Sequence, residues 1–533
     1  MISPATTEKY RNPALLAAGA VLMSLSFHPL NLHFLAWFGL VPVLFALERS
    51  TPGSSFRSGI LFGFTFSMLT LFWIVFLQIE TNIKLLIIFG LIVMYLYIGL
   101  YFGIAMLASR KIGIWSLPLA LVGLEYVRGI GEIGFPWLSF GYSQARYPLF
   151  IQQAAVYGMY GVSLWLVALN VSIYQALKNR GLKNMLLAVA IFIAPVIYGI
   201  ARHEPPRTRI ARVGIVQPNI DPNLKFSREM RFTTFERLIE LSVRCARLSV
   251  QTYGDSLDLI IWPETATPVF LKSPGKYQDL VRQLADRLDV PIFTGTAIYE
   301  SERNEIFNGA VLIEPGHGIT QEYRKMQLVP FSEHMPFNRH IPVLRKVDVG
   351  GGDYTPGTDH VVFDIPGFRF ACLICFESIF PGLSRESVDR GAEVLVNITN
   401  DGWFGKISGA QQHNNMAILR SVENGVVLLR SANTGISMIV DQYGRVVIEK
   451  ELFVDDIIVA AVAVDQVETT YRRIGDILPV ICLIVTTILL ARNYFKTKEE
   501  YPQSHVARPN PKSEYRNSKQ YPKSKCSKQA PGI

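Results

Sequence analysis

The sequence predicts a multi-span α-helical membrane bundle joined to one large layered α/β domain. Half of the 533 residues are hydrophobic and only 18% are charged, against roughly 25% in a soluble domain. The apolar surplus is segregated in residues 12–200 and 474–491, which hold very few charges. Residues 201–470 instead alternate short β-rich runs with helical patterns, as a soluble α/β domain does. This composition excludes a disordered chain and a small disulfide-stapled one.

Eight hydrophobic runs are candidate membrane spans, because about 20 apolar residues cross a hydrocarbon core of about 30 Å. Seven precede the α/β domain and one follows it, near residues 13–28, 31–48, 58–79, 84–107, 112–127, 156–177, 184–200 and 474–491. Residues 129–155 are broken by Gly and Pro and predict an interfacial loop. The predicted regions are a bundle over 1–203, the α/β domain over 204–470, a last span over 471–495 and a basic, disordered tail over 496–533.

Basic residues near the span ends predict the orientation, since Lys and Arg concentrate on the cytoplasmic side. With the N-terminus inside, the inner segments hold most of them, among them Arg49, Arg110 and Lys178. Seven spans then deliver the α/β domain to the outer side, and the eighth returns the C-terminus to the cytoplasm. The tail from Lys496 holds nine basic and three acidic residues, which favours contact with anionic lipid over nucleic-acid binding.

Nine strands and four helices are predicted inside the α/β domain from its apolar runs and helical periodicity. The strands are Ile210–Val216, Leu257–Trp262, Pro291–Thr296, Ala310–Ile313, His360–Phe363, Phe368–Ile374, Val394–Ile398, Val426–Arg430 and Ile436–Val440. The helices cover residues 228–251, 275–289, 382–390 and 411–423.

No metal or cofactor site is predicted. Cys372 and Cys375 form C-x-x-C, but positions i and i+3 of a strand lie about 10 Å apart on opposite faces, too far for a disulfide. A second C-x-x-C or a nearby His pair that would complete a zinc site is absent from the sequence. The sequence also has no phosphate-binding P-loop and no dinucleotide fingerprint.

Three segments place a polar or nucleophilic side chain where an apolar run gives way to a loop, and layered α/β folds form their sites at such strand ends. Glu264 closes one run, Lys325 precedes the segment LVPFSE at 328–333, and Cys375 ends a third run. Residues 400–405 read NDGWFG after a fourth. Each segment alone is equally well an ordinary strand exit, a core cysteine or a turn. Their joint occurrence in this order favours a function.

The order Glu264, Lys325, Cys375, together with residues 400–404, resembles the nitrilase superfamily. The segment LVPF at 328–331, Glu333 and the spans on both sides are similar to its membrane-embedded branch, the apolipoprotein N-acyltransferases. The resemblance runs from the first span to about residue 491. It implies a nitrilase-like α-β-β-α sandwich, with Glu264, Lys325 and Cys375 as the catalytic triad.

By the same resemblance, Glu333 and Glu377 are supporting acidic positions, and Phe376 and Phe226 are aromatic positions of the site. This chain departs from the family at both aromatic positions, where Tyr and Trp are usual. Each replacement keeps an aromatic ring and loses a polar handle. Neither residue can therefore supply a hydroxyl or an indole N–H.

The residue types suit acyl transfer through a thioester. A thiol is a poor nucleophile until it ionises, and the Lys325 ammonium is expected to lower the pKa of Cys375. Glu264 can accept the thiol proton and later return it to the leaving group. The Lys325 ammonium and the Phe376 backbone N–H are the expected donors to the oxyanion.

The resemblance implies an acyltransferase of the bacterial cytoplasmic membrane, multi-pass, with its catalytic domain in the periplasm and both termini in the cytoplasm. It would take an acyl chain from a phospholipid, such as phosphatidylethanolamine, to the N-terminal amine of the S-diacylglyceryl-cysteine of apolipoproteins, the last step of lipoprotein maturation. Two alternatives stay open. One is a membrane-tethered amidase or nitrilase with water as acceptor. The other is a transporter or receptor with a non-catalytic module, which the scarcity of charges in the spans disfavours.

Overall fold

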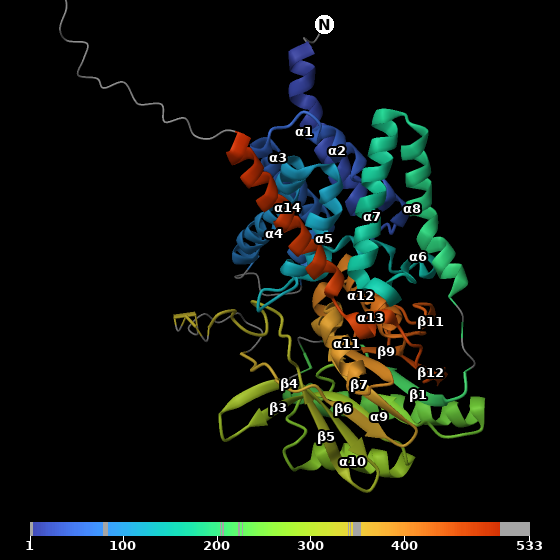
Figure 1. The fold of residues 1–533 in the computed structure, drawn as a ribbon. Coiled ribbons are helices and arrows are strands. Elements are labelled where there is room, and N and C mark those ends of the chain that lie inside the picture. Colours follow the sequence, from blue (N-terminus) through green and yellow to red (C-terminus); the bar gives the residue numbers. More distant parts are fainter. Residues whose placement is uncertain are drawn as a thin grey trace, which may run out of the picture. The chain divides into compact units, whose positions relative to one another are not determined.

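The computed structural model describes residues 4–77, 84–202, 204, 207–221, 224–225, 227–338, 340–341, 343–344 and 353–500. Figure 1 traces the elements along the chain. The part of the predicted tail beyond residue 500 lies outside the described residues, and so does Phe226.

The regular elements described in the N-terminal region are all helices. Its α-helices are α1 (Pro4–Leu25), α2 (Val41–Leu47), α3 (Pro52–Thr70), α4 (Lys84–Ile112), α5 (Leu117–Arg128), α6 (Pro148–Ile151), α7 (Ala154–Asn179) and α8 (Leu182–Ala201). Short 3-10 helices connect them: η1 (His33–Trp37), η2 (Phe72–Phe76), η4 (Ile114–Ser116), η5 (Pro136–Leu138) and η6 (Phe140–Gln144). One more long helix, α14 (Ile477–Glu500), follows the α/β domain.

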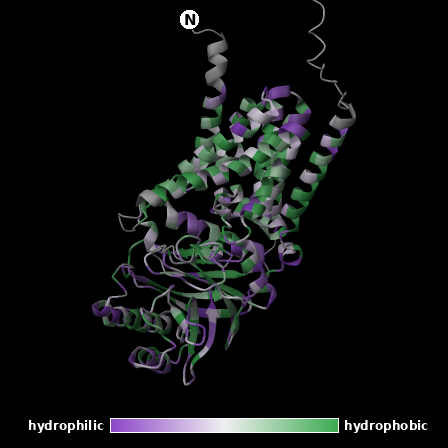
Figure 2. Cartoon of the chain, turned by 90° about the vertical axis from the view of Figure 1, so that its left-hand side faces the viewer, coloured by the Kyte–Doolittle hydropathy of each residue, from purple (hydrophilic) through white to green (hydrophobic). Residues whose placement is uncertain are grey.

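Four described helices are long and apolar enough to cross a membrane. Their spanning parts are Ile87–Ile112, Ala154–Asn179, Leu182–Ala201 and Ile477–Thr497. Two shorter apolar helices, Asn12–Leu25 and His33–Leu47, lie at the first two predicted spans. Figure 2 shows the hydrophobic colour concentrated in the helical region and mixed colours in the α/β domain. The chain therefore has the apolar helices that the composition predicts for a membrane protein.

Helices α3 and α4 approach each other closely because glycines line their contact. A Cβ added to Gly59 would lie 2.6 Å from the Cα of Gly103, and one added to Gly63 would lie 2.9 Å from the Cα of Gly99. Both helices thus carry glycine at two positions four residues apart, the pattern that lets membrane helices pack backbone to backbone. Gly90, also on α4, faces open space instead.

The α/β domain is built on two six-stranded sheets, ordered β12-β1-β2-β3-β4-β5 and β11-β10-β9-β8-β7-β6. The strands are β1 (Ile210–Gln217), β2 (Leu259–Ile261), β3 (Ile292–Glu300), β4 (Glu305–Glu314), β5 (Gly318–Arg324), β6 (Val362–Ile365), β7 (Phe368–Ile374), β8 (Val394–Thr399), β9 (Val427–Ala432), β10 (Met438–Val440), β11 (Val446–Glu449) and β12 (Asp456–Ala463). The helices are α9 (Arg228–Tyr253), α10 (Lys276–Leu288), α11 (Pro381–Asp389), α12 (Ser408–Asn424) and α13 (Thr470–Ile474). All nine predicted strands and four predicted helices overlap observed elements, and β5, β11 and β12 are additional.

Three apolar clusters show which helices and sheets of the domain pack against each other. Residues of α9 and α10 pack on one face of the first sheet, and the other face of that sheet packs on the second sheet. The far face of the second sheet packs on α11 and α12, and this cluster continues without a break into the helical region. The domain is therefore the predicted α-β-β-α sandwich, and α12, which belongs to its second helical layer, also packs against the helical region.

Candidate functional site

The structure brings together the three residues predicted as a triad. Glu264 follows β2, Lys325 follows β5, and Cys375 follows β7, so two residues come from one sheet and one from the other. The Nζ of Lys325 lies 3.4 Å from the Oε1 of Glu264. Both side chains are near enough to shift the pKa of the Cys375 thiol, which Glu264 raises and Lys325 lowers. The site is thus built at strand ends where the two sheets face each other.

Besides Lys325, two further donors hold the Glu264 carboxylate. Its Oε1 accepts a hydrogen bond of 2.8 Å from the Nδ2 of Asn308, and its Oε2 accepts one of 2.9 Å from the Asn400 N–H. A second buried ammonium, Lys225, donates to the Thr265 hydroxyl beside it at 2.9 Å, and burial lowers the pKa of Lys225 to about 8. The sequence prediction gave no site role to Asn308 or to Lys225, although Lys225 directly precedes the predicted aromatic position Phe226.

Lys325 is buried between two carboxylates. Its Nζ donates to the Oε1 of Glu333 at 2.8 Å, and the Oε2 of Glu333 accepts from the Val329 N–H at 2.8 Å. Burial alone would lower the pKa of Lys325, but Glu333 first and Glu264 second outweigh it and raise that pKa above its usual range. The lysine is therefore a permanent cation, and Glu333, one of the predicted supporting residues, fixes its position.

Cys375 has a backbone in the left-handed region, with φ of 51°, which costs a residue other than glycine about 1–3 kcal/mol. The side chain is partly buried. Burial first and the Glu264 carboxylate second raise the pKa of the thiol, and Lys325 only partly offsets them. Lys325 does lower the pKa of this cysteine, as expected, but burial and Glu264 raise it by more, so the net pKa lies above the usual range. The resting site holds a protonated thiol with the Glu264 and Lys325 side chains beside it.

Glu377 acts on the backbone around the site. Its Oε2 accepts from the Ile374 N–H at 2.7 Å. Its Oε1 accepts from the Met326 N–H at 2.7 Å, from the Gln327 N–H at 3.1 Å and from the Tyr323 hydroxyl at 2.8 Å. One buried carboxylate thus ties the segment that carries Cys375 to the segment that carries Lys325.

Phe376 packs against the helical region instead of offering a polar group. Its ring lies 6.4 Å from the ring of Phe135, which in turn stacks on Trp137 at 5.8 Å. Phe135 and Trp137 belong to the segment 129–155 that the sequence predicts as an interfacial loop. Phe226 is the other predicted aromatic position, and it lies outside the described residues.

A buried polar cluster behind Cys375 was not predicted. Asp401 accepts from the Thr399 hydroxyl at 2.8 Å and from the Arg430 guanidinium at 2.7 Å. His413 Nδ1 lies 2.9 Å from Asp401 Oδ1 and 3.1 Å from Arg430 Nη2. Residues 400–405, which include Asp401, form a recognisable motif, but no pattern in the sequence indicates that His413 and Arg430 converge on Asp401.

The same cluster places ligand atoms of Cys375, Asp401 and His413 within 4.8 Å of one another. A metal ion at that point would lie against the Arg430 guanidinium, which already binds both Asp401 and His413. The electrostatic repulsion between two cations disfavours that arrangement. The donor set suits an ion-pair network rather than a metal centre.

Comparison with known proteins identifies the family. Residues 19–172 match the family model described as "Apolipoprotein N-acyltransferase N-terminal domain", and residues 212–472 match the model described as "Carbon-nitrogen hydrolase". The apolipoprotein N-acyltransferase of Geobacter metallireducens is 33% identical over 491 residues, which cover 88% of this chain and 93% of that protein. The protein of the same name from Chlorobaculum tepidum is 31% identical over 86% of this chain and 91% of its own length.

Among solved structures, that of Saccharomyces cerevisiae Nit3, described as a member of branch 10 of the nitrilase superfamily, is 18% identical to this chain. The match covers 49% of this chain and 92% of that chain, with a TM-score of 0.38. The full-length relatives carry the conclusion, since they match the helical region and the α/β domain together. On that evidence the chain belongs to the apolipoprotein N-acyltransferase family, and it is an acyltransferase.

Proposed function

We propose that this acyltransferase uses Cys375 to carry an acyl chain from a membrane phospholipid to the N-terminal amine of the S-diacylglyceryl-cysteine of apolipoproteins. The observation that supports this most directly is the convergence of the Cys375 thiol, the Glu264 carboxyl group and the Lys325 ammonium at the ends of strands from the two sheets. A preformed thiolate is not required, because a base in contact can take the proton as attack proceeds.

In the first half-reaction Glu264 takes the thiol proton and the sulfur attacks the ester carbonyl of the phospholipid. The Lys325 ammonium and the Phe376 N–H stabilise the oxyanion. Collapse breaks the ester C–O bond, and Glu264 returns the proton to the departing lysophospholipid oxygen. A thioester on Cys375 remains.

In the second half-reaction the acceptor amine attacks the thioester. Glu264 takes one amine proton, the C–S bond breaks, and the same proton restores the Cys375 thiol. The product is an amide, and the enzyme returns to its resting state with no net change in charge. One carboxylate thus serves as base and acid in both halves.

Exposed aromatic side chains near the site favour substrates that arrive from a bilayer. Phe331 is 61% exposed six residues after Lys325, and Trp403 is 40% exposed in the segment that follows β8. Drawing an acyl chain of about 16 carbons into water would cost about 12 kcal/mol at about 0.8 kcal/mol per CH₂. A nucleophile at the membrane surface avoids that cost.

The proposal includes a topology of eight spans in the bacterial cytoplasmic membrane, with a bundle over 1–203, a periplasmic catalytic domain over 204–470, a last span over 471–495 and both termini in the cytoplasm. The positions of the helix connections support it. Connections that contain His28, Thr70 and Trp137 contact α12 of the catalytic domain. Glu48 and Lys178 lie at connections that the proposed topology places on the cytoplasmic side, and they pair with each other at 2.9 Å.

The test is to incubate the purified protein with phosphatidylethanolamine and a diacylated lipopeptide, and to repeat this with Cys375→Ala. The proposal predicts a lipopeptide that gains one acyl chain with the native protein and none with the variant. Release of free fatty acid without transfer would instead support the hydrolase alternative. Full transfer by Cys375→Ala would overturn the proposal.

A further inference from the structure

The carbonyl oxygen of Cys375 is held by two side chains. The Nε2 of His413 lies 3.0 Å from it, and the Ser378 hydroxyl donates to it at 3.0 Å. Because a carbonyl only accepts, His413 must carry a proton on Nε2 and donate. The residue so restrained is the one whose backbone is in the left-handed region.

Fixing this carbonyl also fixes the next N–H. The C=O of Cys375 and the N–H of Phe376 belong to one planar trans peptide, so the two groups point in opposite directions. His413 and Ser378 hold the oxygen in place, and this fixes the direction of the Phe376 N–H, the donor that the proposed mechanism assigns to the oxyanion. A rotation of this peptide would misdirect the donor without moving Lys325.

His413 is itself held from two directions. On one side it contacts Asp401 and Arg430, as described above. On the other, its ring stacks on the indole of Trp137 at 5.7 Å and an interplanar angle of 23°. Trp137 lies in η5 of the helical region, so the contact crosses from the catalytic domain to the membrane bundle.

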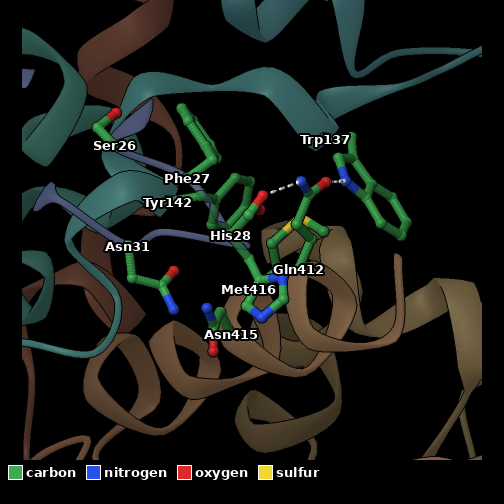
Figure 3. Close-up of a pocket in the computed structure, with 9 residues that line it drawn as sticks. All are labelled: Ser26, Phe27, His28, Asn31, Trp137, Tyr142, Gln412, Asn415 and Met416. Carbon is green, nitrogen blue, oxygen red and sulfur yellow. Dashed lines mark hydrogen bonds between the residues drawn. The ribbon is translucent and has the colours of Figure 1, made fainter. Parts of the chain in front are cut away.

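Gln412, the residue before His413, binds three connections of the bundle at once. Its Oε1 accepts from the indole N–H of Trp73 at 3.1 Å and from that of Trp137 at 2.9 Å. Its Nε2 donates to the carbonyls of His28 at 3.0 Å and Thr70 at 3.1 Å. Figure 3 shows the amide between the His28 carbonyl and the Trp137 indole. All four hydrogen bonds that the amide can make are formed.

We propose that the membrane bundle helps to build the oxyanion site, with His413 and Gln412 as positioning residues for the Cys375–Phe376 peptide. The hydrogen bonds of Gln412 fix the position of α12 against the bundle. His413, on the same helix, then fixes the orientation of the Cys375 carbonyl. The bundle therefore does more than hold the enzyme in the membrane. This inference rests on the proposed function, since it assigns the Phe376 N–H to the oxyanion of that reaction.

The test compares His413→Phe, which keeps a ring against Trp137 and loses the donor, with His413→Gln, which keeps an N–H donor. We expect kcat to fall about 30-fold in His413→Phe, as for a misplaced oxyanion donor, with KM for phosphatidylethanolamine within about threefold. His413→Gln should recover kcat to within about fivefold of the native value. Alkylation of Cys375 by iodoacetamide forms no oxyanion, so its rate should stay within about threefold in both variants.

A second pair tests the link to the bundle. Gln412→Leu should lower kcat about tenfold with an unchanged alkylation rate. Gln411→Leu is the matched control on α12, because its Oε1 is buried without a hydrogen-bond partner, and it should keep kcat within about twofold. A native kcat in Gln412→Leu would overturn the part of the proposal that involves the bundle.

A native kcat in His413→Phe, a loss that His413→Gln does not restore, or an equal loss of alkylation would each overturn the positioning role. If His413→Phe does not fold, Ser378→Ala removes the other donor alone, and a kcat above one third of native would overturn the proposal. An acyl adduct that forms on Cys375 at the native rate in His413→Phe contradicts only this inference. No adduct in the native protein contradicts the proposed function itself.

Discussion

At the residue scale, Glu264 raises the pKa of both groups beside it, and this keeps one of them charged and the other neutral. It raises the pKa of Lys325 and so keeps the cation, and it raises the pKa of Cys375 and so keeps the thiol protonated. A protonated thiol is protected from unwanted alkylation and oxidation, since the thiolate is the reactive form. The cysteine becomes nucleophilic when Glu264 accepts its proton during attack.

This arrangement predicts how Cys375 reacts with iodoacetamide as the pH changes. Because its pKa is raised above the ordinary value of about 8.5, the rate should rise about tenfold per pH unit between pH 7 and pH 9 without levelling off. Glu264→Gln removes the anion that helps to raise the pKa, so alkylation at pH 7.5 should become about tenfold faster. Peptide mass spectrometry measures both rates.

The control for this experiment is Glu236→Gln, a neutralised carboxylate on the exposed face of α9. It should leave the alkylation rate unchanged. A rate in Glu264→Gln that is equal to or slower than that of the native protein would show that Glu264 does not set the state of the thiol.

A second prediction concerns Glu333, which contributes most to raising the pKa of Lys325. Glu333→Gln keeps the shape but weakens the contact to Nζ, so the ammonium is free to shift from the oxyanion. Misplacement of a catalytic group by about 1 Å costs up to about 100-fold, and kcat should fall about 10- to 100-fold. Glu302→Gln, at an exposed turn, should have native kcat. A native kcat in Glu333→Gln would show that Lys325 does not need this partner.

Glu264, Lys325 and Cys375 could be picked out because each stands where an apolar run gives way to a loop and in an order that resembles the family, and Glu333 and Glu377 were assigned by the same resemblance. Asn308, His413 and Arg430 could not, because their roles arise from contacts between residues far apart in sequence. The sign of the Cys375 pKa shift was missed for a related reason. It depends on burial and on a carboxylate from the other sheet, and the residue types alone do not give either.

At the element scale, the predicted strands lie inside the two sheets, except for β6, which is predicted although it is an edge strand. β7 and β8 are mostly apolar, almost fully buried and paired in parallel, and buried parallel strands give a strong apolar signal in the sequence. The strands that escaped prediction, β5, β11 and β12, are all at sheet edges. An edge strand has fewer neighbours to satisfy, so its sequence is less constrained and its pattern weaker.

The contact between α3 and α4 gives a prediction at this scale. Gly59→Ala would push a methyl group to 2.6 Å from the Gly103 Cα, so the helices must separate and thermal stability in detergent should fall by about 1–3 kcal/mol. Gly90→Ala, on the open face of α4, should be neutral or slightly stabilising because alanine favours the helix by about 1 kcal/mol. Equal melting temperatures for the two variants would contradict close packing at Gly59.

At the scale of the whole molecule, the catalytic domain and the bundle share one apolar core. Polar contacts reinforce it: the Tyr142 hydroxyl donates to the Ile379 carbonyl at 2.8 Å, and Arg146 forms an ion pair with Glu449. The sequence predicted a bundle over 1–203 followed directly by an α/β domain over 204–470. It could not predict that α12 would serve both, since that requires knowing which face of each region is uncovered.

The proposed topology can be measured with a membrane-impermeant maleimide on intact spheroplasts, in a Cys526→Ser background. Glu302→Cys, at an exposed turn of the catalytic domain, should be labelled without lysis. Lys183→Cys, at the α7–α8 connection on the basic side, should be labelled only after the membrane is permeabilised. The opposite labelling pattern would place the catalytic domain in the cytoplasm and contradict the proposal.

The central claim is that Cys375 holds the acyl chain between the two substrates. The most direct measurement is mass spectrometry of the protein after incubation with phosphatidylethanolamine and no acceptor. The account predicts one acyl group on the Cys375 peptide, released by hydroxylamine and lost when a diacylated lipopeptide is added. An unmodified Cys375 under conditions in which the complete reaction proceeds would contradict it.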